Sequence, residues 1–406
     1  MTRNELFELI RGGEDSHVAF RRDDVTDDDL AQVLVAFLNV DGGTVLLGVE
    51  EDGTISGTTR EGLEEWVSEA CRELVAPPLI PLLSWVRAAE PGRDVLAVRV
   101  PPGPDKPYAC DPKTYYIRVG RRTREASRDE LERMYQASGR LFYGLKPVTG
   151  ATFDALDSRR LRDYFTRILR VSAPVDEDLL GWQNLLTSLN LMTVFAKQSV
   201  ATIDGILLFG KAPKRFLRHS GIRAVCFPGT EPDYARRADE DLRGPLVQLG
   251  AADGTLVETG LVEQAWDFVR RNTTPSAYLD GGRRTDRWEY PEEVVREIVV
   301  NAVVHRDYSL VGMEIFLAIY ADRLEIESPG GLPSTVTLEG MRSGIRYARN
   351  QTLVNVMRDY QYVDPRGMGV RNKIIPGMRA HNGTEPDFVV EESRVTVRLW
   401  KGEAAR

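Results

Sequence analysis

Residues 296–308 read REIVVNAVVHRDY and directly follow YPEEVV at 290–295. The valines recur at helical spacing, and the Pro-Glu-Glu start favours a helix N-terminus. Glu297 and Asn301 are four residues apart, so their side chains leave the same face of the predicted helix. An amide oxygen can ligate Mg²⁺ without adding charge, and a carboxylate can orient or deprotonate water. The pair predicts a nucleotide-phosphate site; the alternative is an ordinary amphipathic helix with a solvated Asn301.

Two later segments strengthen the nucleotide interpretation: DRLEIESPGGLP at 322–333 and DPRGMGV at 364–370. In this order and spacing, the three blocks resemble the GHKL-type ATP-binding domain shared by DNA gyrase, heat-shock chaperones, histidine kinases and MutL. The similarity is greatest to the RecG-like branch that is attached to Schlafen AlbA_2 domains in bacteria. It implies an α/β (α+β) fold in which ATP lies between a helical layer and a mixed sheet.

The same resemblance implies roles for individual residues. Glu297 is the candidate catalytic base, and Asn301 is the implied Mg²⁺ ligand. The residues implied to bind the nucleotide are Asn301, Ser328, Gly330, Gly331, Gly367 and Gly369. The sequence departs from the wider family at Ser328, which stands where an aspartate reads the adenine. A hydroxyl is a weaker acceptor, so the identity of the nucleotide is less securely implied.

A segment expected to cover the nucleotide reads ARNQ at residues 348–351, where this branch usually carries Ser-Arg-Asn-Pro. Arg349 is predicted either to reach a phosphate or to form a surface salt bridge. His305 lies one turn after Asn301, and we expect its ring to hydrogen bond with Asp307 and Tyr308 and fix their positions.

The first part of the chain carries a second set of motifs, which include GEDS at 13–16, AFLN at 36–39, GVEEDG at 48–53 and YYIRVG at 115–120. These motifs resemble the Schlafen AlbA_2 domain. Some members of that family are metal-dependent RNA endonucleases that use three carboxylates. Others bind nucleic acid or act as regulators without cutting.

The nuclease carboxylates carry over incompletely. The first falls on Glu14, the second on Ala19, and the third on Glu50 or Glu51. A divalent cation needs several hard oxygen ligands, so the loss of the central carboxylate weakens metal binding and water activation. We therefore expect a folded scaffold without nuclease activity.

The net charge of −8 argues against a protein that coats duplexes, so any nucleic-acid surface must be local. Basic residues crowd one strand end and turn, and another basic cluster spans residues 211–223. Solvated faces are the alternative interpretation of both. The candidate nucleic-acid residues are Glu14, Arg21, Glu50, Glu51, Arg118, Arg121 and Arg122.

Composition sets the broad class. The 406 residues, 42% hydrophobic and 28% charged, predict a globular protein of two or three domains. There is no apolar run of membrane-spanning length and no signal-peptide pattern at the N-terminus, so no membrane association is expected. Three separated cysteines and four histidines argue against disulfides or structural zinc and favour a reducing cytoplasm.

Three domains are predicted: an AlbA_2-like domain at 1–135, a mostly helical, winged-helix-like connector at 136–285, and the ATP-binding domain at 286–406. Within the connector, residues 205–212 nearly match a P-loop, but Ala212 offers Mg²⁺ no hydroxyl and Ile206–Phe209 is an apolar run rather than a phosphate-binding loop. This segment resembles the hydrophobic strand that links the two domains in the same bacterial family, so a strand is expected here. Residues 394–400 alternate as expected of a half-buried edge strand. No helicase motor motif is present.

The predicted function is that of an ATP-binding, nucleic-acid-associated regulator in DNA binding or transcription. In this hypothesis, Mg²⁺–ATP binding and slow hydrolysis by a weak ATPase switch the AlbA_2-like domain. Nucleic acid, a protein partner and a second copy of the chain are the expected partners. The alternatives are an ATP-controlled, metal-dependent nuclease acting in antiphage defence and a binding module in which both sites are inert.

Overall fold

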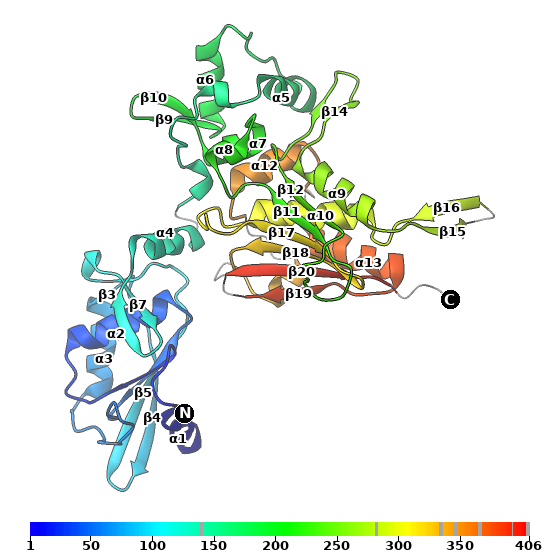
Figure 1. Cartoon of the computed structure of the whole chain (residues 1–406). Helices are drawn as coiled ribbons and strands as arrows, with labels where there is room; N and C mark the ends of the chain where they lie inside the picture. The colour runs from blue at the N-terminus through cyan, green and yellow to red at the C-terminus, as the bar shows by residue number, and fades with distance from the viewer. Residues whose placement is uncertain are drawn as a thin grey trace. The chain divides into compact units, whose positions relative to one another are not determined.

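The computed structural model describes residues 1–138, 141–280, 283–332, 336–344, 348–363, 368–391 and 393–402. The chain divides into two compact units, Met1–Leu141 and Phe142–Arg406 (Figure 1). The predicted AlbA_2-like domain corresponds to the first unit. The second unit combines the segments that the sequence predicted to be a connector and an ATP-binding domain.

The first unit is a four-stranded sheet with helices on both faces. Its helices are α1 (Arg3–Gly12), α2 (Asp27–Asn39), α3 (Leu63–Glu73), η1 (Asp111–Lys113) and α4 (Arg128–Ala137). Its strands are β1 (Val18–Arg21), β2 (Gly43–Leu47), β3 (Val75–Ala76), β4 (Leu82–Glu90), β5 (Arg93–Val100), β6 (Ala109–Cys110), β7 (Tyr116–Val119) and β8 (Arg122–Glu125).

The order of the main sheet is β1-β2-β5-β4, with β1 parallel to β2. Side chains alternate between its faces, as the pleat requires. Val45 and Leu47 pack in the core formed with α2 and α3, whereas Leu46 packs in the smaller core formed with α1. The sheet is thereby buried on both sides, which holds the two ends of β1 in fixed positions.

The second unit begins with a largely helical part, in the order helix, helix, hairpin, helix. Its elements are η2 (Tyr143–Leu145), η3 (Phe153–Ala155), α5 (Ser158–Asp163), the π-helix η4 (Tyr164–Ile168), α6 (Leu179–Ser188), the hairpin β9 (Met192–Phe195) and β10 (Gln198–Ala201), α7 (Ile203–Phe209) and α8 (Pro213–Phe216).

The remainder contains the large sheet and its covering helices. Its strands are β11 (Ile222–Cys226), β12 (Ala238–Leu242), β13 (Leu249–Gly250), β14 (Leu256–Glu258), β15 (Ser276–Asp280), β16 (Arg283–Arg287), β17 (Ile315–Ile319), β18 (Arg323–Pro329), β19 (Asp387–Val390) and β20 (Arg394–Trp400). Its helices are α9 (Leu261–Asn272), α10 (Glu292–His305), α11 (Leu338–Ser343), α12 (Gln351–Asp359), the π-helix η5 (Val370–Ile374) and α13 (Ile375–Asn382).

The six-stranded sheet has the order β12-β11-β17-β18-β20-β19 (Figure 1). β11 pairs in parallel with β17, so two strands from the predicted connector complete the sheet of the predicted ATP-binding domain. For this reason the expected boundary near residue 285 does not separate two compact units. β20 lies between β18 and β19, so the expectation of an edge strand is wrong. Alternation reports that one face is buried, not that a strand lacks a neighbour.

One face of this sheet is covered by helices, and the other carries ion pairs. Helix α10 packs on β18, and α9 packs on β11 and β12. On the opposite face, Glu325 accepts hydrogen bonds from Arg323 and Arg398, at 2.8 and 2.6 Å. Such a helical layer on a mixed sheet is the α/β sandwich that the sequence predicted.

Residues 203–209 form helix α7, which corrects the predicted strand. Thr202 caps it by accepting a hydrogen bond from the Gly205 N–H at 3.1 Å. All seven residues of the helix are buried, so the hydrophobic pattern has no periodicity to distinguish a helix from a strand.

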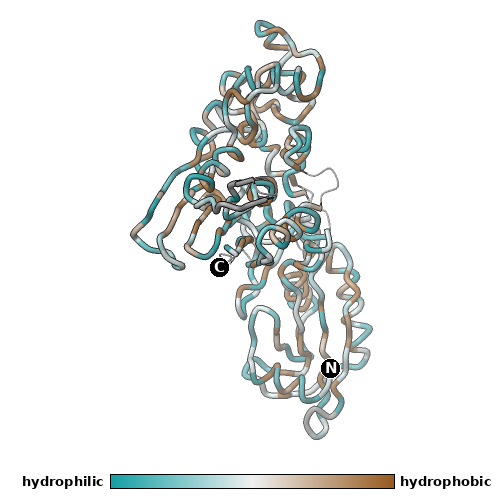
Figure 2. The backbone as a smooth tube through the Cα atoms, turned by 90° about the vertical axis from the view of Figure 1, so that its right-hand side faces the viewer, coloured by the Kyte–Doolittle hydropathy of each residue, from teal (hydrophilic) through white to brown (hydrophobic). Residues whose placement is uncertain are grey.

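Hydrophilic residues interrupt the hydrophobic ones along the helices of both units (Figure 2). Accordingly, none of the helices in the described ranges combines the length and the apolar character needed to cross a membrane.

Candidate functional site

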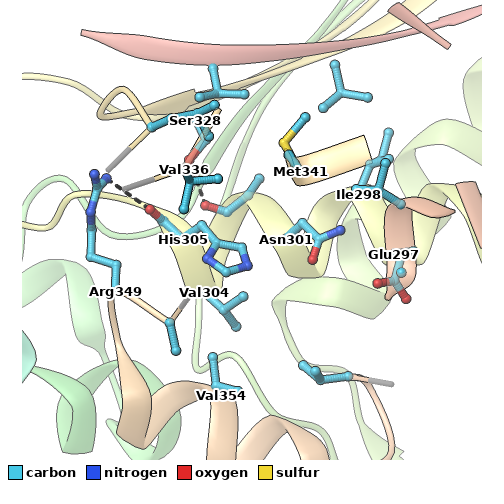
Figure 3. Close-up of a pocket in the computed structure, with 18 of the residues that line it drawn as sticks. Glu297, Ile298, Asn301, Val304, His305, Ser328, Val336, Met341, Arg349 and Val354 are labelled. Carbon is cyan, nitrogen blue, oxygen red and sulfur yellow. Dashed lines mark hydrogen bonds between the residues drawn. The ribbon is translucent and has the colours of Figure 1, made fainter. Parts of the chain in front are cut away.

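A cavity of about 400 Å³ lies between helix α10 and strands β18 and β20, and its wall is completed by α11, α12 and η5 (Figure 3). This volume lies within the range typical of small-molecule sites. Much of the wall is apolar, and these residues come from distant parts of the second unit: Ile298, Ile326, Leu332, Val336, Met341, Val354, Val363, Met368, Val370, Ile374, Phe388, Val395 and Val397.

Helix α10 presents Glu297, Asn301 and His305 on successive turns of its cavity-facing side (Figure 3). Its other positions, such as Val295 and Val299, are buried in the core, which fixes the rotation of the helix. Within the described part of the chain, the Asn301 amide has no hydrogen-bond partner. Its oxygen is thus available to a ligand in the cavity.

Glu297 is held on two sides. Its side chain is 5% exposed, and Lys373 Nζ donates to Oε2 at 3.1 Å. A Cβ at residue 369 would overlap Oε1, so a side chain at Gly369 would require the Glu297 carboxylate to move. Lys373 follows Gly369 by four residues at the π-helix η5, which brings both against Glu297. No sequence motif pointed to Lys373, because its contact with Glu297 joins segments that are far apart in the chain.

The hydroxyl of Ser328 donates to the carbonyl of Ala302 on α10 at 2.8 Å. A hydroxyl has one proton and two lone pairs, so Ser328 retains only acceptor capacity toward the cavity. An acceptor at this position favours a ligand that presents an N–H group.

The turn after β18 depends on Gly330, which has φ +104°, a backbone conformation that glycine adopts readily. Arg349 lies against this glycine and donates to two backbone carbonyls, those of His305 at 3.1 Å and Gly331 at 2.8 Å. Arg349 therefore joins the end of α10 to the turn. Neither expectation for Arg349, a phosphate contact or a surface salt bridge, describes these bonds.

Asn350, which was not identified from the sequence, binds the end of α10 together with Arg349, and the two residues form a clamp on this helix end. Its side-chain amide donates to the carbonyls of Val304 and Arg306, at 3.0 and 2.9 Å. The last carbonyls of a helix lack intrahelical partners, so Asn350 and Arg349 together satisfy three consecutive ones at the end of α10. Arg349 and Asn350 were not predictable as partners of these carbonyls, because polar residues before a helix are common and do not indicate which distant group they bind.

His305 is surrounded by protein, yet its ring is accessible because it faces the cavity. Desolvation, followed by the charge of Arg349, lowers the pKa of His305 to about 4, so the imidazole is neutral at pH 7. The ring therefore adds no charge to the cavity.

The expected hydrogen bonds from His305 to the next residues are wrong. The carboxylate of Asp307 accepts from the Ser309 hydroxyl at 2.6 Å, and Tyr308 donates to the Val303 carbonyl at 3.0 Å. These local bonds fix Asp307 and Tyr308 and leave the His305 ring to the cavity.

The structure thus gathers seven of the predicted nucleotide-site residues around one cavity: Glu297, Asn301, Ser328, Gly330, Gly331, Arg349 and Gly369. Gly367 lies outside the described residues.

In the first unit, Glu14 is part of a closed network. Its Oε1 accepts from the Phe20 N–H at 2.8 Å, from Arg21 at 3.1 Å and from Arg118 at 3.5 Å. Arg118 is fully buried and also donates to the carbonyls of residues 15 and 18. Arg21 and Arg118 are thus used internally, and Arg118 has no surface to offer nucleic acid.

The other candidates of the first unit are distributed around this network. Ala19 lies in β1 and is fully buried, so the missing carboxylate is replaced by a core side chain. Glu50 and Glu51 lie in the turn that follows β2, after residues whose N–H groups bond to the Arg21 carbonyl. Arg121 and Arg122 lie exposed at the β7–β8 turn. Among the described residues, no group of three or more His, Cys, Asp or Glu side chains has a metal-binding arrangement.

Two protein-family models match the chain. Residues 14–127 match "Schlafen, AlbA_2", and residues 312–399 match HATPase_c_4, described as "Putative ATP-dependent DNA helicase recG C-terminal". The protein therefore combines an N-terminal Schlafen AlbA_2 domain with a C-terminal ATPase-like domain of the RecG-related type, as its sequence motifs predicted.

Among solved structures, the DIP2311 protein of Corynebacterium diphtheriae is 22% identical, with a TM-score of 0.45, and the match covers 98% of this chain and 81% of that one. The N-terminal domain of a RecG-related protein from Nitrosomonas europaea is 19% identical, with a TM-score of 0.25, over 29% of this chain and 88% of that one. These similarities are too low to bear on function. No curated protein matches.

Proposed function

We propose that the second unit binds Mg²⁺–ATP in the α10 cavity and that nucleotide binding regulates a nucleic-acid-associated AlbA_2 domain. The observation that carries the proposal is the unpartnered Asn301 amide, which faces an otherwise mainly apolar cavity one turn from the buried Glu297. The match of residues 312–399 to an ATPase-like family supports the same ligand.

The cavity residues divide by chemistry into a base end and a phosphate end. The apolar wall and the acceptor Ser328 suit adenine, whose amino group is a donor, better than guanine, which presents a carbonyl at the equivalent position. Asn301 supplies a neutral oxygen for Mg²⁺, which prefers oxygen ligands and retains several waters. When bound, Mg²⁺ neutralises charge on the phosphates.

Glu297 is placed to act on water. Lys373 and Gly369 restrict its carboxylate, and Oε1 and Oε2 face these two neighbours at the cavity wall. In the proposal, Glu297 orients a water molecule toward the terminal phosphate, and turnover is slow because the protein works as a switch.

The test is thermal unfolding of the full chain with Mg²⁺ and ATP, ADP or GTP. A ligand at about 100 times its Kd stabilises the native state by about 2.7 kcal/mol, which raises Tm by several degrees. We expect ATP to raise Tm more than GTP and the Mg²⁺-dependent part of the rise to vanish in Asn301→Ala. No rise with any nucleotide would refute the proposal.

The nuclease alternative receives less support. The Glu14 carboxylate accepts hydrogen bonds from two arginines and a backbone N–H, and Ala19 is a core residue. Mn²⁺-dependent cleavage of RNA or DNA by the purified protein, lost in Glu14→Ala, is the result that would favour it.

A further inference from the structure

Among the residues that the structure describes, few cations at the phosphate end of the cavity are available to a ligand. The arginines among the lining residues are Arg349 and Arg358. Arg349 is engaged by two backbone carbonyls, and Lys373, just behind the wall, is paired with Glu297. Arg358 is exposed and, among the residues that the structure describes, its guanidinium has no hydrogen-bond or ion-pair partner.

Helix α12 carries Arg358 alongside α10. At the start of α12, Asn350 bonds the carbonyls of Val304 and Arg306 at the end of α10. Tyr362 lies three residues beyond the end of α12, and the guanidinium carbon of Arg296 lies 5.9 Å from the centroid of its ring. The Tyr362 hydroxyl donates a hydrogen bond to Glu263, which also forms an ion pair with Arg296. The two helices therefore run antiparallel, and the C-terminal end of α12 lies beside the N-terminal half of α10.

Distances along the two helices place Arg358 level with the turn of α10 that carries Glu297 and Asn301. Arg358 follows Gln351 by seven residues, which is about 10 Å at 1.5 Å per residue. The same distance back from Val304 along α10 reaches Glu297, one turn before Asn301. Figure 3 shows Val354, midway along this path, facing Val304 across the cavity.

The rotation of α12 is also fixed by packing. Gln351, Val354 and Arg358 follow the i, i+3, i+7 pattern of one helix face, and all three line the cavity. Leu353 and Met357 on the other side are fully buried in the core. Helix α12 therefore cannot rotate to carry Arg358 to another face without displacing core side chains.

We infer that Arg358 binds the phosphate chain of the nucleotide, the role for which sequence analysis considered Arg349. The inference rests on the proposed function and adds a residue to its site. A guanidinium offers two parallel N–H donors to phosphate oxygens, a geometry that suits a polyphosphate and contributes nothing to a nucleoside. Arg358 thereby makes the site select nucleotides over adenosine.

Calorimetric titration of the full chain with ATP, ADP and adenosine, in Mg²⁺, tests this inference. In Arg358→Met we expect ATP and ADP to bind at least about tenfold more weakly and adenosine to bind as in the wild type, because only the phosphate contact is removed. Arg358→Lys keeps the charge without the fork and should recover part of the ATP affinity. Arg379→Met is the matched control, since Arg379 is an exposed arginine of α13 that is paired with Glu385 and does not line the cavity.

The outcomes separate the two claims. If Arg358→Met binds ATP as tightly as the wild type while Asn301→Ala does not, the role of Arg358 is refuted and the proposed function stands. If Arg358→Met loses adenosine as well as ATP, or shows a lower Tm without ligand, its role is structural and the inference is refuted. If the wild type binds no adenine nucleotide, both claims fall.

Discussion

Each unit contains a glutamate that the sequence singled out and that is mostly shielded from solvent, and the two have different surroundings. Glu14 has a side chain that is 12% exposed and is surrounded by two arginines and a backbone N–H. Glu297 has a side chain that is 5% exposed, but it lies at the wall of a cavity together with Asn301, whose amide faces that cavity. Burial and charge therefore do not distinguish the two glutamates. What distinguishes them is whether the neighbourhood is closed by the protein or open to a ligand.

The largest expected effect comes from removing the closed carboxylate. Glu14→Ala leaves the fully buried Arg118 without its counter-ion, and breaking a buried pair in this way costs about 3 kcal/mol. Hydrogen exchange should show the loss of protection within residues 1–141. Glu297→Gln should leave protection unchanged, because Lys373 is partly exposed and can be solvated. Equal losses of protection in the two variants would contradict the distinction between a closed and an open neighbourhood.

A somewhat smaller effect is expected from opening the clamp on α10. Asn350→Ala leaves the carbonyls of Val304 and Arg306 without their partner, and each buried unsatisfied group costs about 1–3 kcal/mol. We expect the free energy of unfolding of the second unit to fall by about 2 kcal/mol and ATP affinity to fall with it. The exposed neighbour on the same helix, Asn355→Ala, is the control. A variant with normal stability would show that the clamp is dispensable.

A third carboxylate, Asp204, extends the comparison to a different environment. Within the described part of the chain it is buried, forms no ion pair with an arginine and does not line the cavity. Its Oδ1 has no hydrogen-bond partner, and burial raises the pKa of Asp204 to about 7, against a smaller opposing effect of Thr352. Between about pH 4 and pH 7 the native state holds a proton that the unfolded chain has released. Over that window, the contribution of Asp204 to the free energy of unfolding falls by about 1.4 kcal/mol per pH unit as the pH rises.

Asp204→Asn has no proton to release, so it should gain stability relative to the wild type by this amount per unit. Chemical denaturation of both proteins across the window measures the difference directly. Parallel pH profiles would show that Asp204 titrates normally in the folded protein.

The smallest expected effect on stability concerns the exposed arginines of the first unit. Arg121→Ala combined with Arg122→Ala should change the free energy of unfolding by less than about 0.5 kcal/mol, since both side chains lie on a turn at the surface. If this turn contacts nucleic acid, each lost phosphate contact reduces the slope of log affinity against log salt by about 1. Filter binding with a generic RNA and DNA at several salt concentrations measures the slope; an unchanged slope would remove Arg121 and Arg122 from the interface.

Local features of this protein were predictable because they depend on near neighbours in the sequence. The strand predicted at 394–400 is β20, which begins at Arg394 and ends at Trp400. The four-residue spacing placed Glu297 and Asn301 on one face of α10, and both do line one cavity. The helix α7 was mistaken for a strand because its apolar run, Ile206–Phe209, is buried on every side and is too short to show a helical period.

The sequence by itself determined the helix that carries Glu297 and Asn301, the alternation of the strands and the two domain families, since each depends on residues close together in the chain. Four features follow from folding alone: Arg118 pairs with Glu14, β11 joins the ATPase-like sheet, Arg349 and Asn350 hold the end of α10, and Arg358 lines the cavity. These outcomes depend on which charges and carbonyls meet after folding, and contacts between residues far apart in the chain leave no pattern in the local sequence.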